Sequence, residues 1–126
     1  MAWFRGKDGG DGAAEDQIDV ASALHLMASG AVVVDVRGRR EYERGHMPGA
    51  RLADSRALAA SPVDAIWGDD PLAETDRPII VVSSTGSRAG RAARVLRRGG
   101  FDASALAGGL VAWTRDGQVL VPGPSR

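Results

Sequence analysis

The pattern of apolar positions predicts two strands buried at the centre of a fold. The runs AVVVDV at 31–36 and PIIVV at 78–82 are continuous and rich in β-branched residues. Continuous runs of this kind are typical of strands that are covered on both faces of a parallel sheet. Shorter strands are expected in ARLA at 50–53 and within DASALAGG at 102–109.

In the segments between these strands, apolar residues recur at the spacing of a helix. Residues 19–30 are expected to form a helix with Asp19 as its N-cap and with Val20, Leu24 and Met27 on one face. Further helices are predicted from spacing and from capping or stop residues at 39–46, near 55–60, around Ile66, at 87–100 and at 110–117.

Strands that alternate with helices indicate an α/β fold with right-handed connections. We therefore expect a parallel sheet of about five strands flanked by helices on both faces. The domain is expected to span residues 17–121, between a flexible N-terminal tail at 1–16 and a C-terminal tail at 122–126. The first tail contains Trp3 and Phe4, which could pack on the domain or contact a partner.

Composition narrows the possible functions. The 126 residues carry 16 basic and 16 acidic side chains, so no overall field attracts the chain to nucleic acid or to an anionic membrane. No segment approaches the roughly 18 to 20 apolar residues that a membrane-spanning helix needs, and no secretory signal precedes the domain, so a cytoplasmic location is expected. The chain has no cysteine, which excludes disulfides, zinc–thiolate sites and a cysteine nucleophile. No metal and no cofactor are expected.

The segment VVSSTGSRAG at 81–90 joins the second buried strand to the longest predicted helix. Such a loop presents unpaired backbone N–H groups beside the positive end of the helix dipole. Its residues are small, a glycine permits a left-handed turn, and an arginine just inside the helix adds a fixed positive charge. These features predict a small-anion site, with an ordinary serine-rich helix cap as the alternative. The candidate residues are Ser84, Thr85, Gly86, Ser87 and Arg88.

Three motifs give this loop a wider context. The first is DVR at 35–37, directly after a buried strand; the second is GHMPGA at 45–50; and the third is LAGGL at 106–110 with Trp113 downstream. Together they resemble the single-domain rhodanese family, in which the second motif reads Gly-His-Ile-Pro-Gly-Ala. The resemblance covers about residues 17–117 and implies the rhodanese-like α/β architecture.

Rhodaneses are sulfurtransferases, and the resemblance implies where their site residues would lie. The family's loop typically reads Cys-Arg-Ser-Gly-x-Arg-Ser, and its cysteine takes up a sulfane sulfur as a persulfide. When this pattern is aligned on Gly86, the cysteine falls on Ser83, its neighbouring arginine on Ser84 and the second arginine on Arg88. The chain therefore has the family's loop without its nucleophile.

Three residues outside the loop are expected to support it. Asp35 and Arg37 are predicted to pair at the strand end, with substrate contact as the alternative. His46 belongs to the family's turn motif, where a structural hydrogen bond is expected. The arginines along the helix at 87–100 are interpreted as a solvated face, with nucleic-acid contact as the alternative.

Sulfur transfer needs a thiolate that attacks sulfur and holds it as a persulfide. A serine hydroxyl is far harder to ionise and would need an adjacent base, for which the sequence offers only His25 and His46. We therefore expect a rhodanese-like domain that is inactive as a sulfurtransferase. Its loop would bind a small oxyanion or sulfur-containing anion, or serve a protein partner, in a binding or regulatory role.

Three alternatives remain open at this stage. The first is a thiosulfate-type sulfurtransferase in which the cysteine has been changed to Ser83. The second is a hydrolase that uses Ser83 as a nucleophile or the loop as an anion clamp. The third is a scaffold in which the loop has no role.

Overall fold

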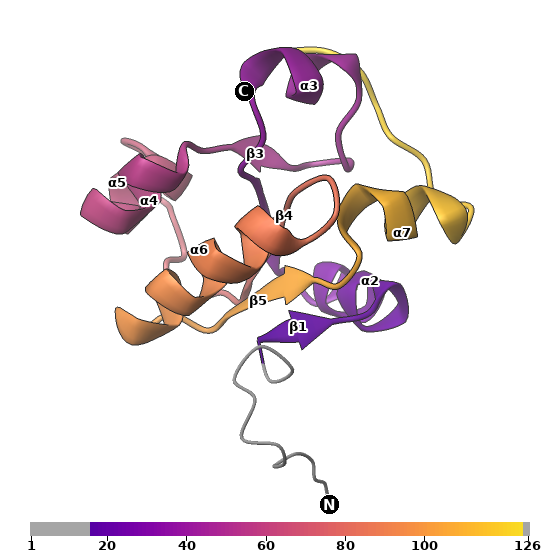
Figure 1. Cartoon of the computed structure of the whole chain (residues 1–126). Coiled ribbons are helices and arrows are strands. Elements are labelled where there is room, and N and C mark those ends of the chain that lie inside the picture. Colours follow the sequence, from indigo (N-terminus) through magenta and orange to yellow (C-terminus); the bar gives the residue numbers. More distant parts are fainter. Residues whose placement is uncertain (1–15, 125–126) are drawn as a thin grey trace, which may run out of the picture.

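Five parallel strands form one sheet in the order β1-β5-β4-β2-β3, which confirms the expected α/β fold (Figure 1). The computed structural model describes residues 16–124. The strands are β1 (Gln17–Ile18), β2 (Val32–Asp35), β3 (Arg51–Leu52), β4 (Ile79–Val82) and β5 (Ala103–Leu106). The helices are α2 (Val20–Ala28), α3 (Arg39–Arg44), α4 (Ser55–Ala60), α5 (Pro62–Trp67), α6 (Ser87–Arg98) and α7 (Gly109–Arg115).

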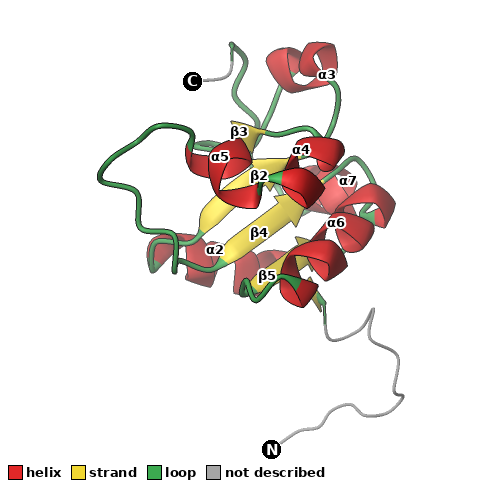
Figure 2. Cartoon of the chain, turned by 90° about the vertical axis from the view of Figure 1, so that its left-hand side faces the viewer, coloured by secondary structure: helices red, strands yellow, loops and turns green. Residues whose placement is uncertain are grey.

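Alternate residues of β4 point to opposite faces of the sheet, as the period of a strand requires. Ile79 and Val81 pack with residues of α4, α5 and α6 on one face. Ile80 and Val82 pack with residues of α2, α3 and α7 on the other face. Helices α4, α5 and α6 lie on the near side of the sheet in Figure 2. All four side chains are buried, which explains why the sequence of β4 is a continuous apolar run.

Helix α2 begins as the sequence predicts. The side chain of Asp19 accepts the backbone N–H of Ser22 at 2.8 Å, and this bond lowers the pKa of the carboxyl group. On the face that carries Val20, Leu24 is 37% exposed, whereas Ala23 is fully buried. The buried residues of this helix are Val20 and Ala23, which are three positions apart and therefore lie on one face. The small side chain of Ala23 lets the helix lie close to the sheet.

Short contacts fix both ends of the described chain to the domain. Strand β1, which the sequence pattern did not reveal, pairs with β5 at the edge of the sheet. Asp16 before it is buried and forms an ion pair with Arg97 at 2.8 Å. At the other end, Val121 pairs with His46 in an antiparallel bridge. The expected tail residues Trp3 and Phe4 lie outside the described residues.

The first turn of α7 packs directly against the loop that follows β4. The backbone N–H groups of Leu110 and Val111 donate to the carbonyl oxygens of Ser83 at 3.0 Å and Ser84 at 3.1 Å. Gly109 adopts a φ of +59°, and a Cβ atom at this position would overlap both of these carbonyl oxygens. Glycine is therefore required at this contact, which holds the loop from one side.

We predict that Gly109→Ala destabilises the domain by about 3 kcal/mol, because it adds backbone strain and overlap with the loop. The matched control is Gly117→Ala, since Gly117 has a φ of +89° but no heavy atom within 4 Å of the place that a Cβ atom would take. Gly117→Ala should lower the free energy of unfolding by only about 1 kcal/mol, which is the cost of a left-handed backbone at a residue with a Cβ atom. Urea unfolding of both variants measures the difference, and equal losses would show that the contact with the loop contributes nothing.

Candidate functional site

The loop after β4 is organised by the side chain of Ser83. This residue is 1% exposed, and its Oγ accepts the backbone N–H groups of Gly86 at 3.1 Å and Ala89 at 3.2 Å. The first backbone bond within α6 runs from the N–H of Gly90 to the carbonyl oxygen of Gly86 at 2.8 Å. The hydroxyl therefore satisfies two N–H groups that precede the regular bonding of the helix.

Other N–H groups of the same loop remain available for a ligand. Ser87 and Arg88 open α6. Their backbone N–H groups, like those of Ser84 and Thr85, have no acceptor within the part of the chain that the structure describes. Gly86 adopts a φ of +106°, which turns the backbone at this point. Thr85, Ser87 and Arg88 are exposed, so an anion from solvent can reach the loop.

An ion pair locks the end of the neighbouring strand β2. Asp35 is fully buried, and its carboxylate accepts the backbone N–H of Arg37 at 2.9 Å and the guanidinium through Nε and Nη2. Nη2 of Arg37 also donates to the carbonyl oxygen of Gly45 at 2.7 Å. The expected pairing of Asp35 with Arg37 is thus present, and it ties the strand end to the turn at Gly45.

A basic cavity of about 550 Å³ opens beside the loop. Its lining includes Arg37, Arg39, Arg56 and Arg88, which come from the ends of β2, α3, α4 and α6. Arg39, Arg56 and Arg88 have no ion-pair partner among residues 16–124. The carboxylate in the lining is that of Asp54, which accepts the backbone N–H of Arg56 at 2.7 Å. Positive charge is therefore concentrated at this edge of the sheet, although the whole chain has a formal charge of zero.

Sequence reasoning missed Arg39 and Arg56 as members of this site. Arg39 is the first residue of α3 and Arg56 the second of α4, so each follows closely after a strand. The carboxyl ends of parallel strands meet at one edge of a sheet, and that rule could have brought these arginines together with Arg88.

His46 lies in a different cavity from Arg88. Its Nδ1 is 2.8 Å from the carbonyl oxygen of Tyr42, and its ring stacks on the tyrosine ring with centroids 3.8 Å apart. The expected structural hydrogen bond of His46 is therefore present. The bonds of Ser83 Oγ within the described residues run to backbone N–H groups, and neither His46 nor His25 contacts it.

Two kinds of feature are absent from the part of the chain that the structure describes. Within residues 16–124, no group of three or more His, Cys, Asp or Glu side chains is arranged to hold a metal ion. The same residues contain no helix that is long and apolar enough to cross a membrane.

Comparison with known proteins agrees with this fold. The thiosulfate sulfurtransferase GlpE of Pseudomonas entomophila (strain L48) is 36% identical over 98 residues, covering 77% of this chain and 83% of that protein. The structure of a rhodanese-related protein from Thermoplasma volcanium has a TM-score of 0.67 at 22% identity, over 83% of this chain and 96% of that chain. A protein from Lactobacillus plantarum gives 0.70 at 25% identity, over 86% and 89%.

These similarities extend along most of the chain. The sequence profile described as the rhodanese-like domain matches residues 19–116, a range that contains β2, β4 and β5, the loop after β4 and the turn before α7. The chain belongs to the rhodanese-like domain family.

Proposed function

We propose that this rhodanese-like domain does not transfer sulfur and instead binds a small oxyanion at the loop after β4, in a binding or regulatory role. The observation that carries the proposal is the arrangement of Ser83. Its hydroxyl stands where the family has its cysteine, is buried, and accepts two backbone N–H groups. It therefore acts as part of the loop's framework rather than as a reactive group.

Sulfur transfer fails at this position for a chemical reason. In the family's reaction a thiolate attacks the outer sulfur of thiosulfate, a sulfur–sulfur bond forms to the enzyme, and sulfite leaves with the electron pair of the broken bond. A hydroxyl offers no comparable nucleophile at neutral pH unless a base removes its proton. No histidine of the described chain contacts Ser83 Oγ, which also argues against the serine hydrolase alternative.

Anion binding would use the backbone N–H groups of the loop that have no acceptor. The unpaired N–H groups of 84, 85, 87 and 88 lie at the start of a helix of 12 residues, where the dipole favours negative charge. The adjoining cavity adds the positive charge of Arg39, Arg56 and Arg88, which have no ion-pair partner among the described residues and outnumber the one unpaired carboxylate in the lining, that of Asp54. A sulfate or thiosulfate ion suits both features, because its oxygens accept several hydrogen bonds at once.

The second candidate is a thiosulfate sulfurtransferase in which Ser83 replaces the cysteine of an active sequence. The similarity to relatives with that name favours it. The serine at position 84 speaks against it, since the loop of the active family typically has an arginine there as well. Restoring the thiol separates the two candidates.

We predict that the unaltered protein transfers no sulfur from thiosulfate to cyanide above background. Ser83→Cys should raise the rate to at least about ten times the background rate, because a thiol in this position lies beside N–H groups that stabilise a thiolate. Ser83→Cys combined with Ser84→Arg should be faster still. Thiocyanate formation measures the rate, with Ser84→Arg alone as the control that adds the arginine without a thiol and keeps the hydrogen bonds of Ser83 Oγ.

Two outcomes of that assay would decide against parts of the proposal. Activity in the unaltered protein would overturn it. A folded but inactive Ser83→Cys variant would show that the loop no longer has the shape that the family's chemistry uses, and the anion site would lose its main support.

We also predict that thiosulfate and sulfate shift the amide NMR signals of Ser84, Thr85, Ser87 and Arg88. Arg88→Gln should weaken this binding about fivefold, because it removes one charge at the edge of the site. The matched control is Arg91→Gln, which removes another exposed charge about one turn further along α6. Equal effects of the two variants, or shifts spread over all surface arginines, would contradict a defined site.

A further inference from the structure

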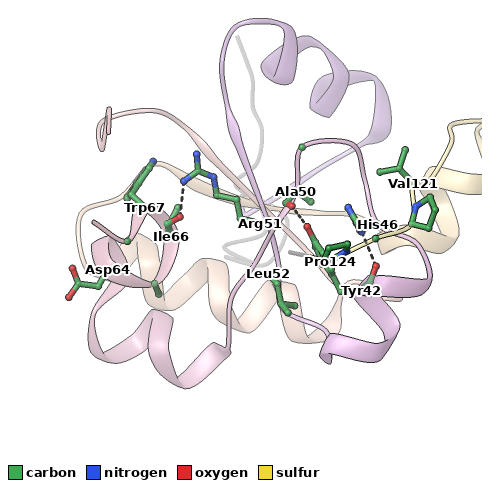
Figure 3. A pocket seen from close by; sticks show the side chains of 15 residues that line it. Tyr42, His46, Ala50, Arg51, Leu52, Asp64, Ile66, Trp67, Val121 and Pro124 are labelled. Carbon is green, nitrogen blue, oxygen red and sulfur yellow. Dashed lines mark hydrogen bonds between the residues drawn. The ribbon is translucent and has the colours of Figure 1, made fainter. Parts of the chain in front are cut away.

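A second cavity, of about 740 Å³, lies away from the loop after β4. It is formed by the segment 49–52 that contains β3, by residues 64–68 of α5 and its C-cap, and by the C-terminal segment 121–124, with Tyr42 and His46 at one end (Figure 3). None of the residues 83–88 lines it. Its volume is within the range of about 300–1,000 Å³ that is usual for small-molecule sites.

Two side chains bring hydrogen-bond donors to one part of this cavity. Arg51 donates from Nη1 to the carbonyl oxygen of Ile66 at 2.9 Å, which places its guanidinium beside the neighbouring Trp67 (Figure 3). The other guanidinium nitrogens have no acceptor within residues 16–124. Trp67 is 6% exposed, and its indole N–H has no acceptor in the same part of the chain. These donors favour an anionic group with two oxygens, such as a carboxylate.

His46 brings an acceptor to the same cavity. Its residue is 6% exposed, and its Nδ1 faces the carbonyl oxygen of Tyr42, so that Nδ1 carries the proton and donates it. Nε2 is then the ring's second hydrogen-bonding atom, and no group among the described residues is hydrogen-bonded to it. A ligand hydroxyl or amino group can satisfy this nitrogen.

The combination indicates a ligand site rather than a gap in packing. Buried polar atoms are almost always hydrogen-bonded, and leaving them unpaired costs free energy. Here two side chains that are more than nine-tenths buried, Trp67 and His46, each have an unpaired polar atom and line one cavity with Arg51. The lining also contains Asp64, whose carboxylate points away from Arg51 (Figure 3).

We propose that this cavity binds a small organic acid. Its carboxylate would accept from the guanidinium of Arg51 and the indole N–H of Trp67, and a hydroxyl group at its other end would donate to Nε2 of His46. The apolar part between them would lie against side chains such as Leu52, Ala65 and Pro124, which line the same cavity. This site does not depend on the anion site after β4, so either can fail without the other.

The probe is 4-hydroxyphenylacetate, which has a carboxylate, an apolar ring and a hydroxyl in this order. NMR titration of the unaltered protein should shift the indole N–H signal of Trp67 and the ring signals of His46, and should leave the amides of 84–88 in place. Phenylacetate lacks the hydroxyl and 2-(4-hydroxyphenyl)ethanol lacks the carboxylate. Each should bind about tenfold more weakly, because phenylacetate loses the contact with His46 and 2-(4-hydroxyphenyl)ethanol loses the contacts of the carboxylate with Arg51 and Trp67.

Variants test the same contacts from the protein's side. Trp67→Phe keeps an aromatic ring but removes the indole donor, and Arg51→Gln removes the charge; each should weaken binding of the probe about fivefold or more. Arg115→Gln, on α7 and outside the cavity, is the matched control and should change nothing. If Arg51→Gln fails to fold, the comparison of the three compounds on the unaltered protein still decides.

Absence of any shift at Trp67 and His46 would overturn the proposal, as would equal binding of all three compounds. Shifts at 84–88 alone would also overturn it, because they would assign the acid to the anion site instead. Binding of the probe that is weakened in Trp67→Phe and Arg51→Gln but unchanged in Arg115→Gln would establish the site.

Discussion

The hydroxyl of Ser83 holds the turn between the central strand and the helix that follows it. It accepts the N–H groups of Gly86 and Ala89, while the carbonyl oxygen of the same residue accepts the N–H of Leu110. One buried residue thereby joins β4, α6 and the start of α7. The shape of the loop depends on these bonds, and so does the direction in which its remaining N–H groups point.

This arrangement explains how a serine can occupy this place in the fold. A serine is close to a cysteine in size, and here it fits a buried position and accepts two backbone N–H groups. It differs in acidity and in its reactivity toward sulfur, which are the properties that persulfide formation needs. The requirement for Gly109 at the neighbouring turn is a matter of space and is independent of the nucleophile.

The sequence predicted the central part of this structure well, for a clear physical reason. Strands β2 and β4 are covered on both faces of the sheet. Continuous β-branched runs such as 32–34 are typical of strands in this position. The order of motifs then located the loop at Ser83. Strand β1 was not predicted, because its two residues, Gln17 and Ile18, are too few to show a periodic pattern.

Other features depend on how distant segments meet. Leu24 and Ala23 are adjacent on α2, and only the position of the helix on the sheet decides which of them is buried. Arg39 and Arg56 lie on different helices and line one cavity because β2 and β3 are parallel neighbours. The second cavity likewise needs the C-terminal segment to return to His46, a contact that no local pattern indicates.

The most direct measurement is a crystal structure of the unaltered protein grown with thiosulfate. We predict an intact thiosulfate ion held by the backbone N–H groups of Ser84, Thr85, Ser87 and Arg88, with Ser83 still bonded to Gly86 and Ala89. The opposite result would be a loop whose N–H groups turn inward to pair within the protein and leave no place for the ion. That structure would contradict the claim that the loop is an anion site without its nucleophile.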